Sequence, residues 1–200
     1  TPGGLVLTLA GVLGDSGSND GLVAAARFSF PVALTLDALG NIFVSDAGND
    51  LVRKVSTTGA VTTIAGAAGQ RAGTDGVGTA ARFFQPYGIR LDAVGNLLVA
   101  DSGNYTIRRI TPAGVVTTVA GLAGQQGVAD GIGPAARFAN PSGLAFDATG
   151  ALFVSDPFNH RISHAVAQVG FPQLTTIPTS QTFGTSGTTL SAAAAGTAPL

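Results

Sequence analysis

Residues 75–83, DGVGTAARF, come nearest in this chain to a known chemical motif. Gly76, Gly78 and Ala81 have the spacing of the loose dinucleotide fingerprint, in which glycines let backbone amides approach a pyrophosphate at a helix start. That motif requires a helix directly after the glycines. Pro86 follows within a few residues and no long amphipathic pattern comes after it, so the sequence argues against a nucleotide site.

The motif is one part of a threefold internal repeat. The tripeptide Ala-Arg-Phe ends at Phe28, Phe83 and Phe138, and the intervals from 28 to 83 and from 83 to 138 are each 55 residues. The first copy of the glycine motif has Val23 in place of the second glycine, and the third has Pro134 at the supposed helix start. The glycines therefore belong to a repeated structural unit.

Polar residues that recur at this period are the candidate site residues. Aspartates stand seven residues before arginines in each copy, and aspartates stand three residues before asparagines at a second position. The first set is Asp20, Arg27, Asp75, Arg82, Asp130 and Arg137, and the second is Asp46, Asn49, Asp101, Asn104, Asp156 and Asn159.

Both sets have a structural interpretation and a functional one. Asp and Asn side chains bond nearby backbone amides and close turns. The Asp–Arg sets are expected to form ion pairs or backbone bonds that hold the link between repeats. The alternative is a ligand or Ca²⁺ site, but one carboxylate per loop is fewer than the several oxygens that calcium takes. We expect a structural role first, on loops that also form the candidate binding face.

Few residues suit catalysis. His160 and His164 lie four apart, with Asp156 as the nearby acid, and zinc would need a further ligand. The chain has no Cys, its eleven acids are all Asp, and no Ser–His–Asp set stands at a recognisable spacing. A pair of Asp carboxylates stays open as an alternative. The sequence predicts no catalytic residue, metal or cofactor.

Each repeat predicts four short strands, which in the second copy are residues 87–92, 97–101, 106–110 and 115–121. Their β-branched and apolar runs end at Gly, Asn, Asp or Pro, and tight turns make neighbours antiparallel. Apolar residues on both faces predict sheets covered on both sides, as in stacked propeller blades. Leu36, Leu91 and Phe146 are expected in the core. Strand direction places the second-to-third-strand turns and the long links at one end, leaving only tight turns at the other.

The composition of the chain restricts its expected partners and cellular location. The 200 residues are 45% hydrophobic and 10% charged, with a net charge of −1. This charge argues against a nucleic-acid partner, and apolar runs are too short for a membrane span. Low charge with abundant Gly, Ala and Thr favours a secreted or cell-surface bacterial protein. Because the chain has no Met, we expect it to be a piece of something longer.

The segment PSGLAFDATGALFVSDPFNHRIS closely resembles an NHL repeat, whose name-giving motif aligns with Asn159, His160, Arg161 and Ile162. PYGIRLDAVGNLLVADSGNYTIRRI and PVALTLDALGNIFVSDAGNDLVRKV are further copies. The resemblance covers residues 1–165 and implies a partial, all-β propeller of four-stranded antiparallel blades, usually six-bladed and used for binding. It departs at Ser163 and His164, where the other copies have two basic residues.

Residues at both ends of the sequence suggest further boundaries between structural segments. Residues 4–11 align with residues 59–66 and predict the fourth strand of a blade. Residues 166–177 are expected to be a linker, and residues 178–200 resemble the start of an immunoglobulin-like sandwich. The predicted function is a non-catalytic interaction propeller with a protein or carbohydrate ligand and possible self-association through open blade edges. The alternatives are part of a lyase or lactonase-type hydrolase whose catalytic residues lie outside this chain, or a structural spacer.

Overall fold

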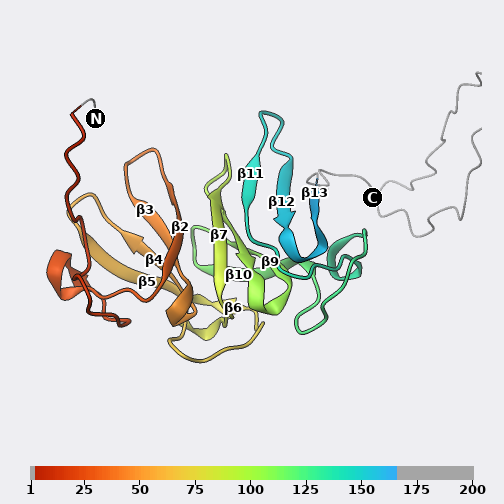
Figure 1. The fold of residues 1–200 in the computed structure, drawn as a ribbon, viewed down its shortest axis with the longest axis horizontal. Coiled ribbons are helices and arrows are strands. Elements are labelled where there is room, and N and C mark those ends of the chain that lie inside the picture. Colours follow the sequence, from red (N-terminus) through yellow and green to blue (C-terminus); the bar gives the residue numbers. More distant parts are fainter. Residues whose placement is uncertain (1–2, 166–200) are drawn as a thin grey trace, which may run out of the picture. The chain divides into compact units, whose positions relative to one another are not determined.

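The computed structural model describes residues 3–165, which form three antiparallel sheets, one for each copy of the repeat (Figure 1). Blade 1 comprises β1 (Gly21–Leu22), β2 (Pro31–Leu36), β3 (Ile42–Asp46), β4 (Leu51–Val55) and β5 (Ala60–Gly66). Blade 2 comprises β6 (Gly76–Val77), β7 (Pro86–Leu91), β8 (Leu97–Asp101), β9 (Thr106–Ile110) and β10 (Val115–Gly121). Blade 3 comprises β11 (Leu144–Phe146), β12 (Leu152–Asp156) and β13 (Arg161–Ala165).

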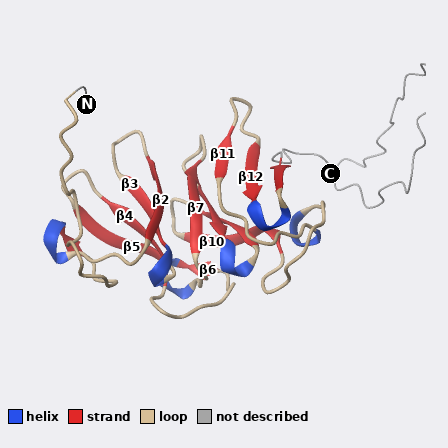
Figure 2. Cartoon of the chain, viewed as in Figure 1, coloured by secondary structure: helices blue, strands red, loops and turns tan. Residues whose placement is uncertain are grey.

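The helices are single 3₁₀ turns in the links and after the second long strand of each blade (Figure 2). They are η1 (Val23–Ala25), η2 (Ala47–Asn49), η3 (Gly78–Ala80), η4 (Ser102–Asn104), η5 (Gly133–Ala135) and η6 (Pro157–Asn159). The predicted four antiparallel strands per repeat are confirmed for blades 1 and 2, within a residue of the expected bounds. Blades 1 and 2 each contain a fifth strand of two residues, β1 and β6, that the sequence did not predict.

That extra strand ties each link to its own blade. The sheet orders are β1-β5-β4-β3-β2 and β6-β10-β9-β8-β7, so a link first pairs with the outermost long strand and then enters the innermost one. Pairing Gly21 with Val61 and Gly76 with Val116 fixes this path in both blades. The link and the turns η2 and η4 consequently meet at the same end of the blade.

The core lies between blades. One cluster joins Val52 and Ala65 of blade 1 to Ile89, Val99 and other residues of blade 2. A second joins Leu98, Ala100 and Ile107 of blade 2 to Leu144, Leu152 and Val154 of blade 3. The sheet of blade 2 is therefore covered on both faces, as the apolar residues on both faces of its strands predict.

The core expectation is wrong for Leu36, which is 54% exposed, because no neighbouring blade covers its face of blade 1 within the described residues. Leu91 and Phe146 are half-buried and pack against the two interblade clusters. The strand expected at residues 4–11 is also absent from the described chain. In blades 1 and 2 the equivalent strands β5 and β10 pair with β4 and β9, and within the described residues no strand pairs with residues 4–11. The expected linker and immunoglobulin-like segment lie outside the described residues.

Candidate functional site

A buried arginine lies at the centre of the polar network of blade 2. Arg108 projects from β9 with no exposed surface. One guanidinium nitrogen donates to Asp101 Oδ2 at 2.8 Å, and the other donates to Asp75 Oδ1 at 2.8 Å. The same two nitrogens donate to the backbone carbonyls of Arg82 and Thr74 at 2.9 Å each. One side chain thereby fastens the long link, residues 67–85, to the end of β8.

Blade 1 repeats the arrangement with Arg53 on β4. Its nitrogens lie 2.8 Å from Asp46 Oδ2 and 2.7 Å from Asp20 Oδ1, and they also donate to link carbonyls. Each guanidinium also lies over a phenyl ring, Arg53 at 5.2 Å from the Phe28 centroid and Arg108 at 5.0 Å from that of Phe83. A buried charge with this many partners stabilises the structure, because removing a carboxylate partner would leave the buried charge only partly compensated.

The Asp–Asn pairs complete the network. Asp101 Oδ1 accepts the backbone N–H of Phe84 at 2.8 Å, and Asn104 Nδ2 donates to Asp101 Oδ2 at 2.7 Å and to Ala72 O at 2.8 Å. Asp46 and Asn49 make the equivalent bonds in blade 1, and Asp156 and Asn159 do so in blade 3. These side chains bind the preceding link, a longer-range role than the turn closure expected from the sequence.

The carboxylates have shifted acidities with identifiable causes. Burial raises the pKa of Asp101 to about 6, against the opposing attraction of Arg108 and the bonds from Asn104 and Phe84. Burial likewise raises the pKa of Asp46 above its ordinary value, opposed by Asn49. Burial also raises the pKa of Asp75, but the hydrogen bonds from Thr118 and Arg108 together outweigh burial, so that the pKa of Asp75 is lowered.

Blade 3 lacks the central arginine, because Ser163 stands at the position of Arg53 and Arg108. Arg161, two residues earlier on β13, reaches Asp130 Oδ1 at 2.7 Å and donates to Ser163 Oγ at 2.9 Å. Asp130 is 94% exposed here, whereas Asp75 is half-exposed. The departure noted in the sequence thus replaces a buried network with a surface ion pair.

The aspartates and arginines of the links form ion pairs and backbone bonds, but not with each other. Asp20, Asp75 and Asp130 pair with arginines of the blade, not with Arg27, Arg82 and Arg137. The three link arginines instead cap carbonyls around η1, η3 and η5, and Arg27 also pairs with Asp15 at 2.6 Å. The residues missed, Arg53 and Arg108, did leave a signal, because an arginine recurs after 55 residues at the centre of the third long strand.

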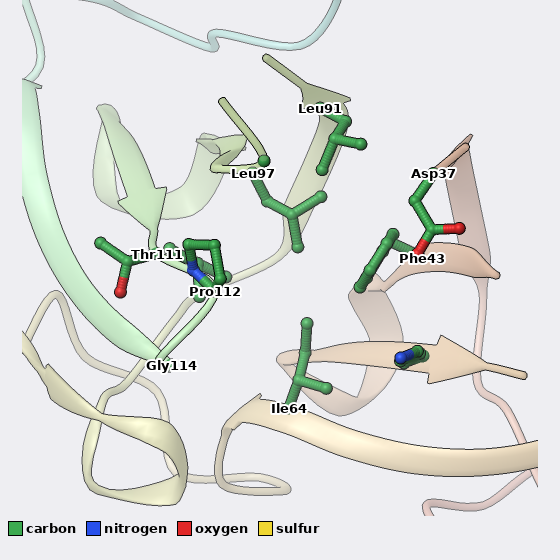
Figure 3. A pocket seen from close by; sticks show the side chains of 11 residues that line it. Asp37, Phe43, Ile64, Leu91, Leu97, Thr111, Pro112 and Gly114 are labelled. Atoms are coloured by element: carbon green, nitrogen blue, oxygen red, sulfur yellow. The ribbon is translucent and has the colours of Figure 1, made fainter. Parts of the chain in front are cut away.

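A groove of about 410 Å³ lies between blades 1 and 2, at the end opposite the links (Figure 3). Phe43, Ile64, Leu91, Leu97 and Pro112 make its walls largely apolar. Asp37 and Lys54 supply the charged groups. The sequence predicts only tight turns at this end, because the gap between the turns of two blades depends on how the blades pack.

The two charged residues of the groove, Asp37 and Lys54, differ in how far neighbouring residues already bind their charged groups. Asp37 accepts bonds from Asn41 Nδ2 and from the backbone N–H groups of Leu39 and Asn41, and these bonds lower its pKa. Lys54 Nζ lies 5.9 Å from the Phe43 ring centroid, and no carboxylate of the described residues forms an ion pair with it. The groove therefore offers an apolar floor beside an ammonium group.

The histidines do not form a site together with other ligands. His160 is exposed in a left-handed turn, and His164 stacks on Phe153 with ring centroids 4.8 Å apart. Within residues 3–165 no group of three His or Asp side chains is placed to hold a metal ion. Over the same residues no helix is long and apolar enough to cross a membrane.

Comparisons with known proteins agree with this architecture. No family model matches the chain. It is 33% identical over 174 residues to the bovine NHL repeat-containing protein 2, covering 80% of this chain and 24% of that protein. The chain thus spans about a quarter of that relative.

Solved structures from Bacteroides are similar in fold. A protein of unknown function from Bacteroides thetaiotaomicron has a TM-score of 0.59 at 29% identity, over 63% of this chain and 32% of that one. An auxiliary nutrient binding protein from Bacteroides ovatus has a TM-score of 0.63 at 23% identity, over 72% of this chain and 38% of that one. The chain therefore has the β-propeller fold, built from blades similar to those of NHL-repeat proteins.

Proposed function

We propose that this chain is a non-catalytic binding segment of a secreted or cell-surface bacterial protein. The observation that carries the proposal is the groove between blades 1 and 2, where apolar walls lie beside the ammonium group of Lys54, which no carboxylate of the described residues pairs with. The repeated charged residues at the link end contribute to structure instead. Arg53 and Arg108 and their carboxylate partners are already engaged with one another, which supports a scaffold role for that network.

The groove suits a ligand with an apolar body and one anionic group. Phe43, Ile64 and Leu91 would cover the apolar part, because burying apolar surface provides most of the affinity of such sites. Lys54 would pair with the anionic group. The link-end loops with Asp20, Arg27 and their repeats remain a second candidate surface, since loops on a rigid scaffold often carry binding residues.

Binding can be tested with 8-anilinonaphthalene-1-sulfonate, an aromatic anion, followed by amide shifts in ¹⁵N-labelled protein. We expect saturable shifts at Ile64, Leu91 and Thr111, removed by Ile64→Asp and weakened by Lys54→Gln. Val94→Asp, at an exposed turn position outside the groove lining, is the matched control. Shifts confined to residues 19–30 and 74–85 would move the site to the links and contradict the groove.

Catalysis is tested separately. A virginiamycin B lyase from Staphylococcus aureus has a TM-score of 0.50 at 16% identity, which is a likeness of fold alone. We expect no turnover of a panel of lactones and esters beyond that of heat-denatured protein. Faster hydrolysis by the folded chain, lost in Asp37→Asn, would overturn the non-catalytic proposal.

A further inference from the structure

Two oppositely charged side chains line the groove between blades 1 and 2. They are the carboxylate of Asp37 and the ammonium group of Lys54. Within the described residues they form no ion pair with one another, and Lys54 forms none with any other carboxylate. The groove therefore presents an anion and a cation that a bound molecule can reach separately.

Both charges lie on the same face of the blade 1 sheet. Thr35 lies opposite Phe43 in one ladder and Phe43 lies opposite Lys54 in the next, so these three side chains share a face. Asp37 follows Thr35 by two residues and returns to that face. Two strand spacings and two residues separate the Cα atoms of Asp37 and Lys54 by a distance on the order of 12 Å. The Lys54 side chain closes part of it, since Nζ lies 5.9 Å from the ring centroid of Phe43, which stands between them.

The carboxylate of Asp37 has room for one more donor. Its Oδ1 accepts the N–H groups of Leu39 at 3.0 Å and Asn41 at 2.8 Å, whereas its Oδ2 accepts only Asn41 Nδ2, at 2.7 Å. An ionised carboxylate has about four acceptor positions, so one remains on Oδ2. The side-chain bond from Asn41 is the largest cause of the lowered pKa of Asp37, and the charge of Lys54 acts in the same direction. Asp37 is consequently ionised at neutral pH.

A simple anion would use only one of these two charges. An anionic group bound beside Lys54 would also be repelled by the carboxylate of Asp37, because like charges repel across such short distances. A molecule that places an ammonium group beside Asp37 as well would turn that repulsion into attraction. Between the two charges, Phe43, Ile64 and Leu91 offer apolar contact to a hydrocarbon side chain.

We propose that the groove binds a small zwitterion with an aliphatic side chain, its carboxylate beside Lys54 and its ammonium group beside Asp37. This inference rests on the proposed binding function of the groove and adds the class of ligand. Free apolar α-amino acids and apolar dipeptides share this chemistry. They differ in the separation of their charged groups, so affinity distinguishes them.

Leu91 sets the space that is left for the ligand side chain. Blade 3 has Phe146 at the position of Leu91, and Phe146 packs against the cluster that contains Leu98, the equivalent of Phe43. Each of these two contacts between blades thus combines one Phe with one Leu. A second Phe in the groove, introduced by Leu91→Phe, would fill part of its volume of about 410 Å³.

Isothermal titration calorimetry of the full 200-residue chain tests the ligand class. The probes are leucine, leucyl-leucine, N-acetyl-leucyl-leucine, which lacks the ammonium group, and leucyl-leucine amide, which lacks the carboxylate. We expect each blocked dipeptide to bind at least about fivefold more weakly than the free one, because it forms one ion pair fewer. Tighter binding of leucine or of leucyl-leucine supports the class and identifies its source. Equal affinities of the free and blocked dipeptides, or no binding of the zwitterions at millimolar concentration, would overturn it.

Matched variants assign the two charges to their positions. Asp37→Asn should remove the preference for the free over the acetylated dipeptide. Asp92→Asn alters the equivalent turn of blade 2, outside the groove lining, and should keep that preference. Lys54→Gln should remove the preference for the free dipeptide over the amide, whereas Arg109→Gln, at the equivalent position of blade 2, should keep it. The same preferences in all four variants would contradict the assigned contacts.

Leu91→Phe should weaken the binding of leucyl-leucine about tenfold or more, because the added ring overpacks the occupied groove. Leu36→Phe adds the same ring at the equivalent position of blade 1, outside the groove lining, and should leave the affinity unchanged. Equal affinities of these two variants would contradict the placement of the ligand. Melting temperatures measured by circular dichroism show that both variants are folded.

The ligand class and the groove itself fail in different ways. Saturable amide shifts at Ile64 and Leu91 with 8-anilinonaphthalene-1-sulfonate, but no preference for zwitterions, would overturn the ligand class and leave the groove as a binding site. Absence of both responses would overturn the groove as well.

Discussion

The guanidinium of Arg108 lies 2.8 Å from Asp75 Oδ1, although 33 positions separate the two residues in sequence. This ion pair joins the middle of blade 2 to the link that enters it. Since the link also supplies strand β6, the pair holds one blade and its connection together as a unit.

Arg108→Leu should lower the free energy of unfolding by about 3–5 kcal/mol, because it leaves the buried carboxylate of Asp101 without its cation. Arg109→Ala is the matched control on the same strand. Its side chain is exposed, so we expect a change within about 0.5 kcal/mol. Urea unfolding followed by circular dichroism measures both. Equal losses would show that the network adds nothing to stability.

Stability should depend on pH through Asp101, whose pKa is raised to about 6 in the folded chain from 3.8. Between these values the folded state binds more protons than the unfolded state, so this group's contribution falls as pH rises from about 4 through 6. Asp101→Asn, which cannot ionise, should lack that fall. The difference between the two unfolding profiles should reach about 2–3 kcal/mol, at about 1.4 kcal/mol per pKa unit. Parallel profiles from pH 4 to 7 would contradict this prediction.

The opposite pH dependence of stability is expected from Asp75, whose pKa is lowered in the folded chain. Its contribution is present above the unfolded value and is lost as pH falls through the folded value. Asp75→Asn should therefore be less stable than the unmodified chain at pH 7, and the two should converge as the solution becomes acidic. Unfolding curves at pH 7 and pH 3 make the comparison, and a gap that widens in acid would argue against the assigned partners.

Ile89→Ala should cost about 2–5 kcal/mol, because it opens a cavity in the cluster between blades 1 and 2. Leu34→Ala at the equivalent position of blade 1 should cost less than about 1 kcal/mol, because Leu34 is half-exposed. Thermal unfolding of both variants checks the contrast. A larger loss from Leu34→Ala than from Ile89→Ala would contradict the difference in burial between the two positions.

Gly88→Ala should weaken the contact between blades 2 and 3. A Cβ atom at position 88 would lie 2.1 Å from the backbone carbonyl oxygen of Ser142, and backbone cannot move aside as a side chain does. We expect a lower melting temperature and faster amide exchange along β11 and β12. Ala33, at the equivalent position of blade 1, already carries this methyl group, and Ala33→Gly should be tolerated with a small loss.

The sequence by itself determined the repeat, the four long strands and the end of the blade at which the links meet the turns. Period, alternation and turn residues are local properties, so they can be read without knowing what packs where. The resemblance carried by residues 141–163 pointed to the correct fold. Whether the candidate polar residues bind a ligand remains a prediction.

Tertiary structure alone decided which partners the polar residues have and which apolar residues are buried. Asp75 lies near Arg82 in sequence yet pairs with Arg108, because β6 pairing brings the link across the sheet toward β9. Leu36 and Leu91 occupy one repeat position, but only Leu91 packs against a neighbouring blade. Repetition makes such residues identical in sequence, whereas burial and ion pairing depend on the particular neighbour that each blade has.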